Sequence, residues 1–280
     1  MSAGHVHRRR RGGFIENTIE GLYWAMDRAL YAESAANAGG LLQRLDARVK
    51  VAGLFALLLA SALSVRLWVI ASILGLAVVL AVCSLISVDT LASQVWAGAF
   101  AFTGPLALPA VFLTPGVAVF RLPGLHWTAT AQGLHTAGYL ILRVETAATL
   151  TVLLVFTTPW MHVLKALRVF RAPVVLVVIL GMTCRYILLL LETAHEMFEA
   201  RKSRTVGRFT AAGYRRLAAS STGVLMGKTY YLSGEVFLAM QARGFRGEVY
   251  LLDDFQMRRL DWAALTVFAA LAAASIWAGR

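Results

Sequence analysis

Two short arginine-containing stretches, Ser203-Arg204-Thr205 and Ala242-Arg243-Gly244, lie in the one long polar segment of an otherwise apolar chain. Each is placed where a run of residues with helical spacing ends, and Gly244 suits the position that follows a helix C-terminus. The planar guanidinium group of arginine binds carboxylates and backbone carbonyls through several N–H donors at once. The pattern therefore predicts two helix ends that dock on another chain, and it predicts no reaction chemistry.

The first of these arginines has a competitor. A series of glutamates from Glu192 to Glu199 runs at helical spacing into Arg201 and Arg204. Carboxylates near the start and cations at the end also suit a solvated helix, because the helix dipole favours that order. The docking interpretation is favoured because two such ends occur in one segment of a chain without a visible ATP-binding or catalytic site. Either Arg201 or Arg204 could fill the first position.

Arg143 and Glu145 are ionisable residues inside an apolar stretch. Such groups are costly in a membrane and tend to find partners or line polar cavities. Two residues apart on a helix, they point to different sides and do not readily pair with each other. We expect each to be an intramembrane polar contact, satisfied by a neighbouring helix or a partner subunit; a direct role in ion passage is the alternative.

Other stretches resemble chemical motifs without meeting their requirements. Gly223 to Thr229 has three residues between its glycines, whereas a phosphate-binding Walker A loop needs four, and no strand precedes it. His5 and His7 stand in a basic N-terminal stretch, and Cys83 and Cys184 lie in apolar surroundings without metal-binding spacing. We therefore predict no catalytic residue, no metal ligand and no cofactor in this chain.

The composition requires a membrane. Of the 280 residues, 59% are hydrophobic, in continuous runs close to the roughly 20 residues that cross a hydrocarbon core of about 30 Å as a helix. We predict an all-α integral membrane protein with about five transmembrane helices plus a cytoplasmic or interfacial domain of coupling helices. The expected spans are Val49–Ser64, Leu67–Val88, Gln94–Leu113, Ala131–Thr158 and Trp262–Trp277. The stretch from Thr114 to Gly124 is expected to be an exposed loop, because it contains Pro115-Gly116.

The basic residues set the orientation. Most of the 27 Lys and Arg fall into two groups, one up to Lys50 and one from Lys165 to Arg259. Both groups should be cytoplasmic by the positive-inside bias, which requires an even number of spans between them. Val174–Leu191 is therefore placed on the cytoplasmic side, although its hydropathy would also suit a span. The basic residues also suit anionic lipid headgroups, whereas no nucleic-acid-binding module is recognisable.

These assignments divide the chain into four regions. The expected regions are an N-terminal cytoplasmic amphipathic region (1–47), a four-helix transmembrane part (48–159), cytoplasmic coupling helices (160–259) and a C-terminal transmembrane helix (260–280).

Five stretches resemble, in order and spacing, the transmembrane T component of an energy-coupling factor (ECF) ABC transporter of the CbiQ or NikQ type. The stretches are Leu45-Asp46-Ala47-Arg48-Val49-Lys50, Thr157-Thr158-Pro159, Arg185-Tyr186, Ala200-Arg201-Lys202-Ser203-Arg204-Thr205 and Ala239 to Gly247. The chain departs from the family in two places: Ser203-Arg204-Thr205 stands for Ala-Arg-Gly, and Asp46-Ala47 stands for the commoner Asp-Pro.

The resemblance implies a non-catalytic transport subunit. In this family, arginines of two Ala-Arg-Gly-like motifs dock into grooves of paired ABC ATPases, which carry out ATP hydrolysis; by position these arginines are Arg204 and Arg243. The implied partners are a CbiO-like ATPase dimer, a CbiM-like substrate-binding membrane subunit and a small CbiN-like accessory subunit. The implied location is the bacterial inner membrane, with the N-terminus and the coupling helices on the cytoplasmic side. The implied cargo is cobalt, which is used for cobalamin biosynthesis, or nickel.

Three other classes stay open at this point. A T component of a vitamin-type ECF transporter would share the docking arginines. A conventional ABC importer permease would carry one glutamate- and alanine-rich coupling loop, which the sequence lacks. A polytopic membrane enzyme would need clustered polar catalytic residues, for which Arg143 and Glu145 are the only candidates.

Overall fold

The computed structural model describes residues 21, 24, 36, 39–86, 89, 91–115, 118–121, 128–204, 210–245 and 257–279. The chain forms two compact units, and each is described by itself. The first, here called the bundle, comprises the described residues within 32–170 and 253–280. The second, here called the helix pair, comprises the described residues within 171–252 together with residues 21 and 24.

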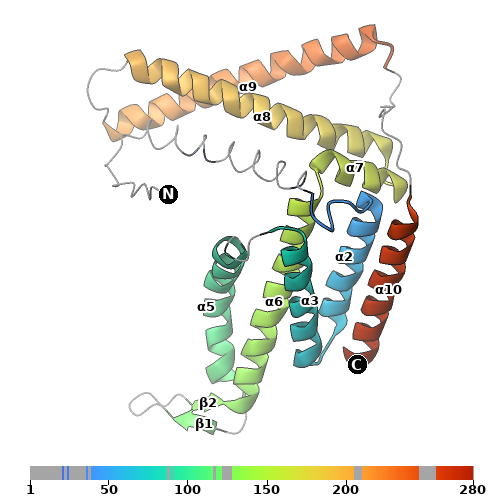
Figure 1. The fold of residues 1–280 in the computed structure, drawn as a ribbon. Coiled ribbons are helices and arrows are strands. Elements are labelled where there is room, and N and C mark those ends of the chain that lie inside the picture. Colours follow the sequence, from blue (N-terminus) through green and yellow to red (C-terminus); the bar gives the residue numbers. More distant parts are fainter. Residues whose placement is uncertain are drawn as a thin grey trace, which may run out of the picture. The chain divides into compact units, whose positions relative to one another are not determined.

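The bundle consists of apolar helices. Its elements are α2 (Ala47–Leu63), α3 (Leu67–Cys83), the π-helical turn η1 (Leu91–Trp96), α5 (Ala97–Leu113), α6 (Ala131–Thr157), α7 (Trp160–Val169) and α10 (Arg259–Gly279). In Figure 1, α2, α3, α6 and α10 lie side by side, α5 runs along α6, and α7 contacts α2. The helix pair consists of α8 (Val174–Arg204) and α9 (Ala211–Ala242). The described chain is thus almost entirely helical, which confirms the predicted all-α membrane class.

A small β-hairpin joins α5 to α6. Strand β1 (Ala118–Arg121) pairs antiparallel with β2 (Thr128–Thr130), so the prediction of a plain loop from Thr114 to Gly124 was wrong for these residues. Thr130 ends β2 and begins α6: its hydroxyl accepts a hydrogen bond from Gly133 N at 3.1 Å and donates one to Thr114 O at 2.8 Å. Short strands of this kind give no clear hydropathy signal, which is why the sequence did not reveal them.

Within the described part of the chain, four helices are long and apolar enough to cross a membrane by length and composition: Leu91–Phe112, Ala131–Thr157, Val174–Arg201 and Arg259–Gly279. Helices α2 and α3 have 17 residues each, or about 26 Å, slightly less than the hydrocarbon core; short helices are accommodated by local thinning of the bilayer. The apolar half of α8 therefore meets the criterion for a membrane span. The orientation inferred from the basic residues had placed this stretch on the cytoplasmic side instead.

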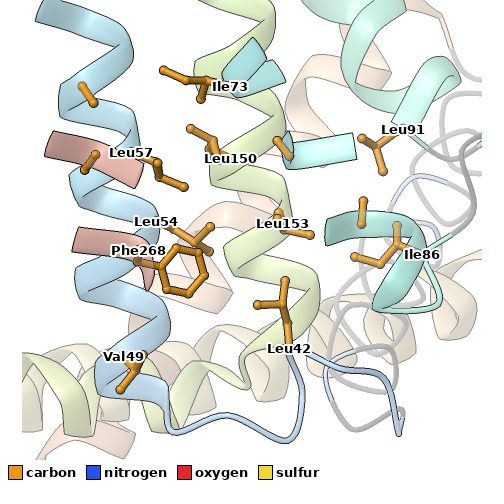
Figure 2. Packing of buried hydrophobic residues seen from close by; sticks show 14 of the residues in the cluster. Leu42, Val49, Leu54, Leu57, Ile73, Ile86, Leu91, Leu150, Leu153 and Phe268 are labelled. Atoms are coloured by element: carbon orange, nitrogen blue, oxygen red, sulfur yellow. The ribbon is translucent and has the colours of Figure 1, made fainter. Parts of the chain in front are cut away.

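The core of the bundle lies between α2, α3, α6 and α10. Figure 2 shows Leu54 and Leu57 of α2 and Phe268 of α10 beside Leu150 and Leu153 of α6. Lipid chains are as apolar as leucine, so close packing, and not escape from water, holds such helices together in a bilayer. Shape complementarity at these contacts therefore decides whether the helices associate.

Gly53 of α2 lies directly against Phe268 of α10. A Cβ atom at this position would lie 2.6 Å from Cγ and Cδ2 of Phe268 and 3.0 Å from its Cβ. Small residues at helix contacts let backbones approach closely in membranes. Because the nearest atoms belong to the rigid base of the phenylalanine ring, the neighbour cannot simply swing away.

We expect Gly53→Ala to destabilise the bundle by about 1 to 3 kcal/mol through overpacking against Phe268. Thermal unfolding of the purified protein would measure this. Gly75→Ala in α3 is the matched control, because nothing lies within 4 Å of a Cβ placed there. In a Phe268→Ala background, Gly53→Ala should cost little; an equal cost in both backgrounds would contradict the contact.

Candidate functional site

The first predicted arginine stretch is the end of α8. The helix ends at Arg204, and the side chains of Ser203 and Arg204 are exposed. Ser203 Oγ donates a hydrogen bond to Ala200 O at 2.9 Å, a bond within the last turn of the helix. Thr205 lies outside the described residues. Arg204 is thus presented at a helix C-terminus, where the dipole favours a cation.

The second stretch forms the C-terminal cap of α9. Gly244 N donates to Gln241 O at 2.9 Å and Phe245 N to Met240 O at 3.0 Å, the two bonds of a Schellman motif. Gly244 has a φ of 75°, the left-handed conformation that this motif requires and that a side chain disfavours. Ala242 and Arg243 are exposed. The expected glycine cap is therefore present, and it fixes the backbone that carries Arg243.

The two helix ends point in opposite directions. Lys228 Nζ of α9 donates to Thr193 Oγ1 of α8 at 3.2 Å, and Arg201 of α8 donates to Ser220 Oγ of α9 at 3.3 Å, so the helices run antiparallel where they cross (Figure 1). Counting along the helices from these contacts at 1.5 Å per residue places Arg204 and Arg243 on the order of 40 Å apart. The crossing of α8 and α9 thus presents two arginines at widely separated positions.

Arg201 and Arg204 differ in their surroundings. Arg201 is half-buried and its guanidinium reaches Ser220 on the other helix, whereas Arg204 is exposed. A group that already contacts α9 is less available to a second protein than one at the free end of the helix. This geometry supports the choice of Arg204 in the first stretch.

The helix pair also carries apolar side chains that nothing in the described chain covers. Val175, Ile179 and Ile187 of α8 are 64%, 57% and 51% exposed, and Met226 and Tyr230 of α9 are 71% and 82% exposed. Exposed apolar side chains that gather into a patch mark contact with lipid or with another protein. The pair therefore combines an apolar surface with charged ends.

A buried polar junction joins three helix ends of the bundle. Lys50 Nζ, on a side chain that is 2% exposed, donates to Thr157 O at 2.7 Å, so the Leu45–Lys50 and Thr157–Pro159 stretches meet although they are 107 residues apart. The last carbonyls of a helix lack intrahelical partners, and the ammonium group satisfies one of them at the end of α6.

Asp261, which sequence reasoning missed, completes this junction. Its Oδ1 accepts from Asp46 N and its Oδ2 from Arg258 N, both at 2.8 Å, while Asp46 in turn accepts from Arg48 N at 2.9 Å. One carboxylate, 3% exposed, therefore caps the starts of both α10 and α2. The signal for its local role was present: an acidic residue in the third position of an apolar helix. Its bond to Asp46, 215 residues away, left no trace in the sequence.

Arg143 and Glu145 have separate environments, as their spacing predicted. Arg143 donates to Tyr139 OH at 3.3 Å with its guanidinium 5.6 Å from the ring centroid, and Tyr139 OH donates to Ser64 O at 2.7 Å. Glu145 is buried, at 8% exposure. These two residues form no ion pair with each other in the described part of the chain.

The described residues also bear on metal binding. Among them, no three His, Cys, Asp or Glu side chains lie close enough together to hold a metal ion. His5 and His7 fall outside the described residues.

Comparisons with known proteins show what the chain is similar to. A family model described as cobalt transport protein, CbiQ, matches residues 39–251. An uncharacterised protein of Methanocaldococcus jannaschii is 32% identical over 238 residues, which cover 84% of this chain and 82% of the relative. A Rhodobacter capsulatus protein named cobalt transport protein CbiQ is 30% identical over 147 residues, covering 52% of this chain and 60% of the relative. The matched region of the family model contains both arginine stretches.

We expect Asp261→Ala to lower the free energy of unfolding of the bundle by about 2 to 4 kcal/mol, because two buried backbone N–H groups lose their acceptor. Asp261→Asn, which keeps one acceptor oxygen, should cost less. Thermal unfolding would measure both, with Asp89→Ala as control, since an exposed carboxylate contributes within about 0.5 kcal/mol. Equal midpoints for Asp261→Ala and the control would contradict the double cap.

We expect Gly244→Ala to destabilise the end of α9 by about 1 kcal/mol, because alanine is strained at positive φ. Amide hydrogen exchange in the last turn of α9 should then become roughly fivefold faster. Gly234→Ala is the matched control within the same helix: a Cβ there meets nothing within 4 Å, and alanine favours a helix interior. Unchanged exchange in Gly244→Ala would contradict the cap.

Proposed function

Because the chain belongs to the CbiQ family of cobalt transport proteins, we propose that it is the membrane coupling subunit, the T component, of an ECF-type ABC importer for cobalt or nickel. In this role it transmits the motion of an ATPase pair to a substrate-binding membrane subunit. It hydrolyses no ATP itself; the ATPases are separate chains.

The separation of the two exposed arginines is the observation that carries this proposal. Arg204 and Arg243 stand at opposite ends of the antiparallel α8 and α9, on the order of 40 Å apart. A single ATPase groove accommodates one helix end, whereas two subunits of an ATPase dimer offer two grooves at a distance. Each guanidinium would bind acidic side chains or backbone carbonyls of its groove.

The crossing of α8 and α9 supports a mechanical role. When the ATPase dimer closes on ATP, the two docked helix ends are drawn with their grooves, and the side-chain contacts at the crossing transmit the change from one helix to the other. Coupling of this kind requires an interface with two arrangements that the nucleotide and the cargo favour differently. The substrate-binding subunit then reorients and releases the ion inside.

The exposed apolar side chains of the helix pair support contact with a membrane-embedded partner. Val175 and Ile179 of α8 and Tyr230 of α9 would pack against a CbiM-like substrate-binding subunit, with a CbiN-like subunit nearby. The basic residues from Lys165 to Arg259 would face the cytoplasm and bind anionic headgroups, which places both coupling helices and the N-terminus on the inner side of the bacterial plasma membrane.

Cobalt is the favoured cargo. The Rhodobacter capsulatus relative carries cobalt transport in its name. Uptake of labelled cobalt and of labelled nickel by the whole assembly would decide between the two ions.

We expect Arg243→Glu to abolish ion uptake by the assembled transporter and to reduce copurification of the ATPase subunits at least tenfold, while the protein still inserts in the membrane. The charge reversal places a carboxylate against groups that accept hydrogen bonds, which costs several kcal/mol at a docked interface. Uptake of labelled cobalt and pull-down of the ATPases measure the two effects.

Arg66→Glu is the matched control, because Arg66 is an exposed arginine at the turn between α2 and α3 and belongs to the bundle, not to the helix pair. It should retain uptake and ATPase association. Normal uptake in Arg243→Glu, or an equal loss in Arg66→Glu, would overturn the assignment.

A further inference from the structure

Glu145 is a buried carboxyl group that the proposed transport mechanism does not use. It lies in the middle of α6, is 8% exposed, and its Oε2 atom has no hydrogen-bond partner among the described residues. An ionised carboxylate normally accepts several hydrogen bonds or faces a cation when it is buried. This one does neither.

Among the described residues, the helices around Glu145 supply no compensating charge. The elements that pack on α6 include α2, α3, α5, η1 and β2. Of these, α3, α5, η1 and β2 contain no Lys, Arg or His. Arg48 and Lys50 lie in the first turn of α2, and Lys50 is bonded to Thr157 O, twelve residues or roughly 18 Å along α6 from Glu145.

The basic residues of α6 itself, His135 and Arg143, do not reach the carboxyl group. Arg143 is two residues away, about 160° around the helix, and is engaged with Tyr139. His135 lies ten residues earlier and is exposed. A negative charge on Glu145 would therefore stand alone in a low-dielectric environment.

The facing helix provides a second, independent observation. Thr103 of α5 is 2% exposed, and its hydroxyl also has no hydrogen-bond partner among the described residues. Helices α5 and α6 run antiparallel between two contacts: Trp96 Nε1 donates to Thr149 Oγ1 at 3.1 Å, and Gly133 lies against the carbonyls of Ala110 and Val111. Thr103 and Glu145 both lie between these contacts, and their positions along the helix axes differ by roughly 5 Å.

Two prolines remove two of the usual helical hydrogen bonds of α5. Pro105 and Pro109 lie inside α5 and have no N–H, so the carbonyls of Ala101 and Pro105 cannot receive the usual helical bond. In a membrane such groups are satisfied by neighbouring side chains or waters. The seam itself offers the Thr103 hydroxyl, whose oxygen can accept the hydrogen bond of a protonated carboxyl group.

We propose that Glu145 is a proton-binding site within the membrane part of the protein. The carboxyl group carries its proton while α5 is packed on α6, and its O–H faces the α5–α6 seam, where the Thr103 oxygen is an acceptor. The ligand is a proton, and the site stands on the bundle alone, independently of ATPase docking.

The test is infrared spectroscopy of the full chain, assembled with its partner subunits in lipid, at neutral pH. The wild type should show the C=O stretching band of a protonated carboxyl group, shifted in D2O and missing from Glu145→Gln. Glu192→Gln removes an exposed carboxyl group of α8 and is the matched control, which should keep the band. A spectrum in which Glu145→Gln removes only carboxylate absorption would overturn the proposal.

A second readout uses stability. Glutamine is a neutral replacement of nearly the same shape, so Glu145→Gln should unfold at the same temperature as the wild type. A large loss of stability would show instead that Glu145 is ionised and paired with a cation, which also overturns the proposal. If Glu145→Gln does not assemble, Glu145→Asp should keep a protonated-carboxyl band at a changed frequency, and its absence would count against the site.

Discussion

The architecture of the bundle depends on one constraint: backbone groups at helix ends must find partners where water is scarce. Asp261 meets it for two helices at once, since its two oxygens accept from the first N–H groups at the starts of α2 and α10. Lys50 meets it at the end of α6 through Thr157 O. These bonds fix the level of three helices relative to one another, so the apolar packing above them starts from a defined register.

Apolar packing alone would not define that register. Hydrophobic residues are spread evenly around α2 and α3, and helices in lipid gain little from simply meeting. What distinguishes one arrangement is local shape, such as the contact of Gly53 with Phe268 and of Gly133 with the carbonyls of α5. The polar junction and the glycine contacts therefore act together: the first sets the level of each helix, and the second sets which faces touch.

Much of this could be predicted from the sequence, because helix length, helix ends and burial in lipid are local properties. The ends of α8 and α9 and the glycine cap at Gly244 follow from spacing and residue type. The bond between Asp46 and Asp261 could not be predicted, because it joins positions 215 residues apart. The β-hairpin was missed because strands of three and four residues carry too few side chains to establish an alternating pattern.

Arg143 and Glu145 show why an ionisable residue in a membrane helix has to be interpreted from its contacts and not from its type. The guanidinium of Arg143 has an aromatic face and a hydroxyl within reach, and Tyr139 is itself held by Ser64 O, so a permanent cation is tolerated. No described residue donates a hydrogen bond to Glu145 Oε2, yet Glu145 has a way to avoid charge that arginine lacks, since a carboxyl group can keep its proton. The same helix thus holds one charge by surrounding it with partners and removes the other by protonation.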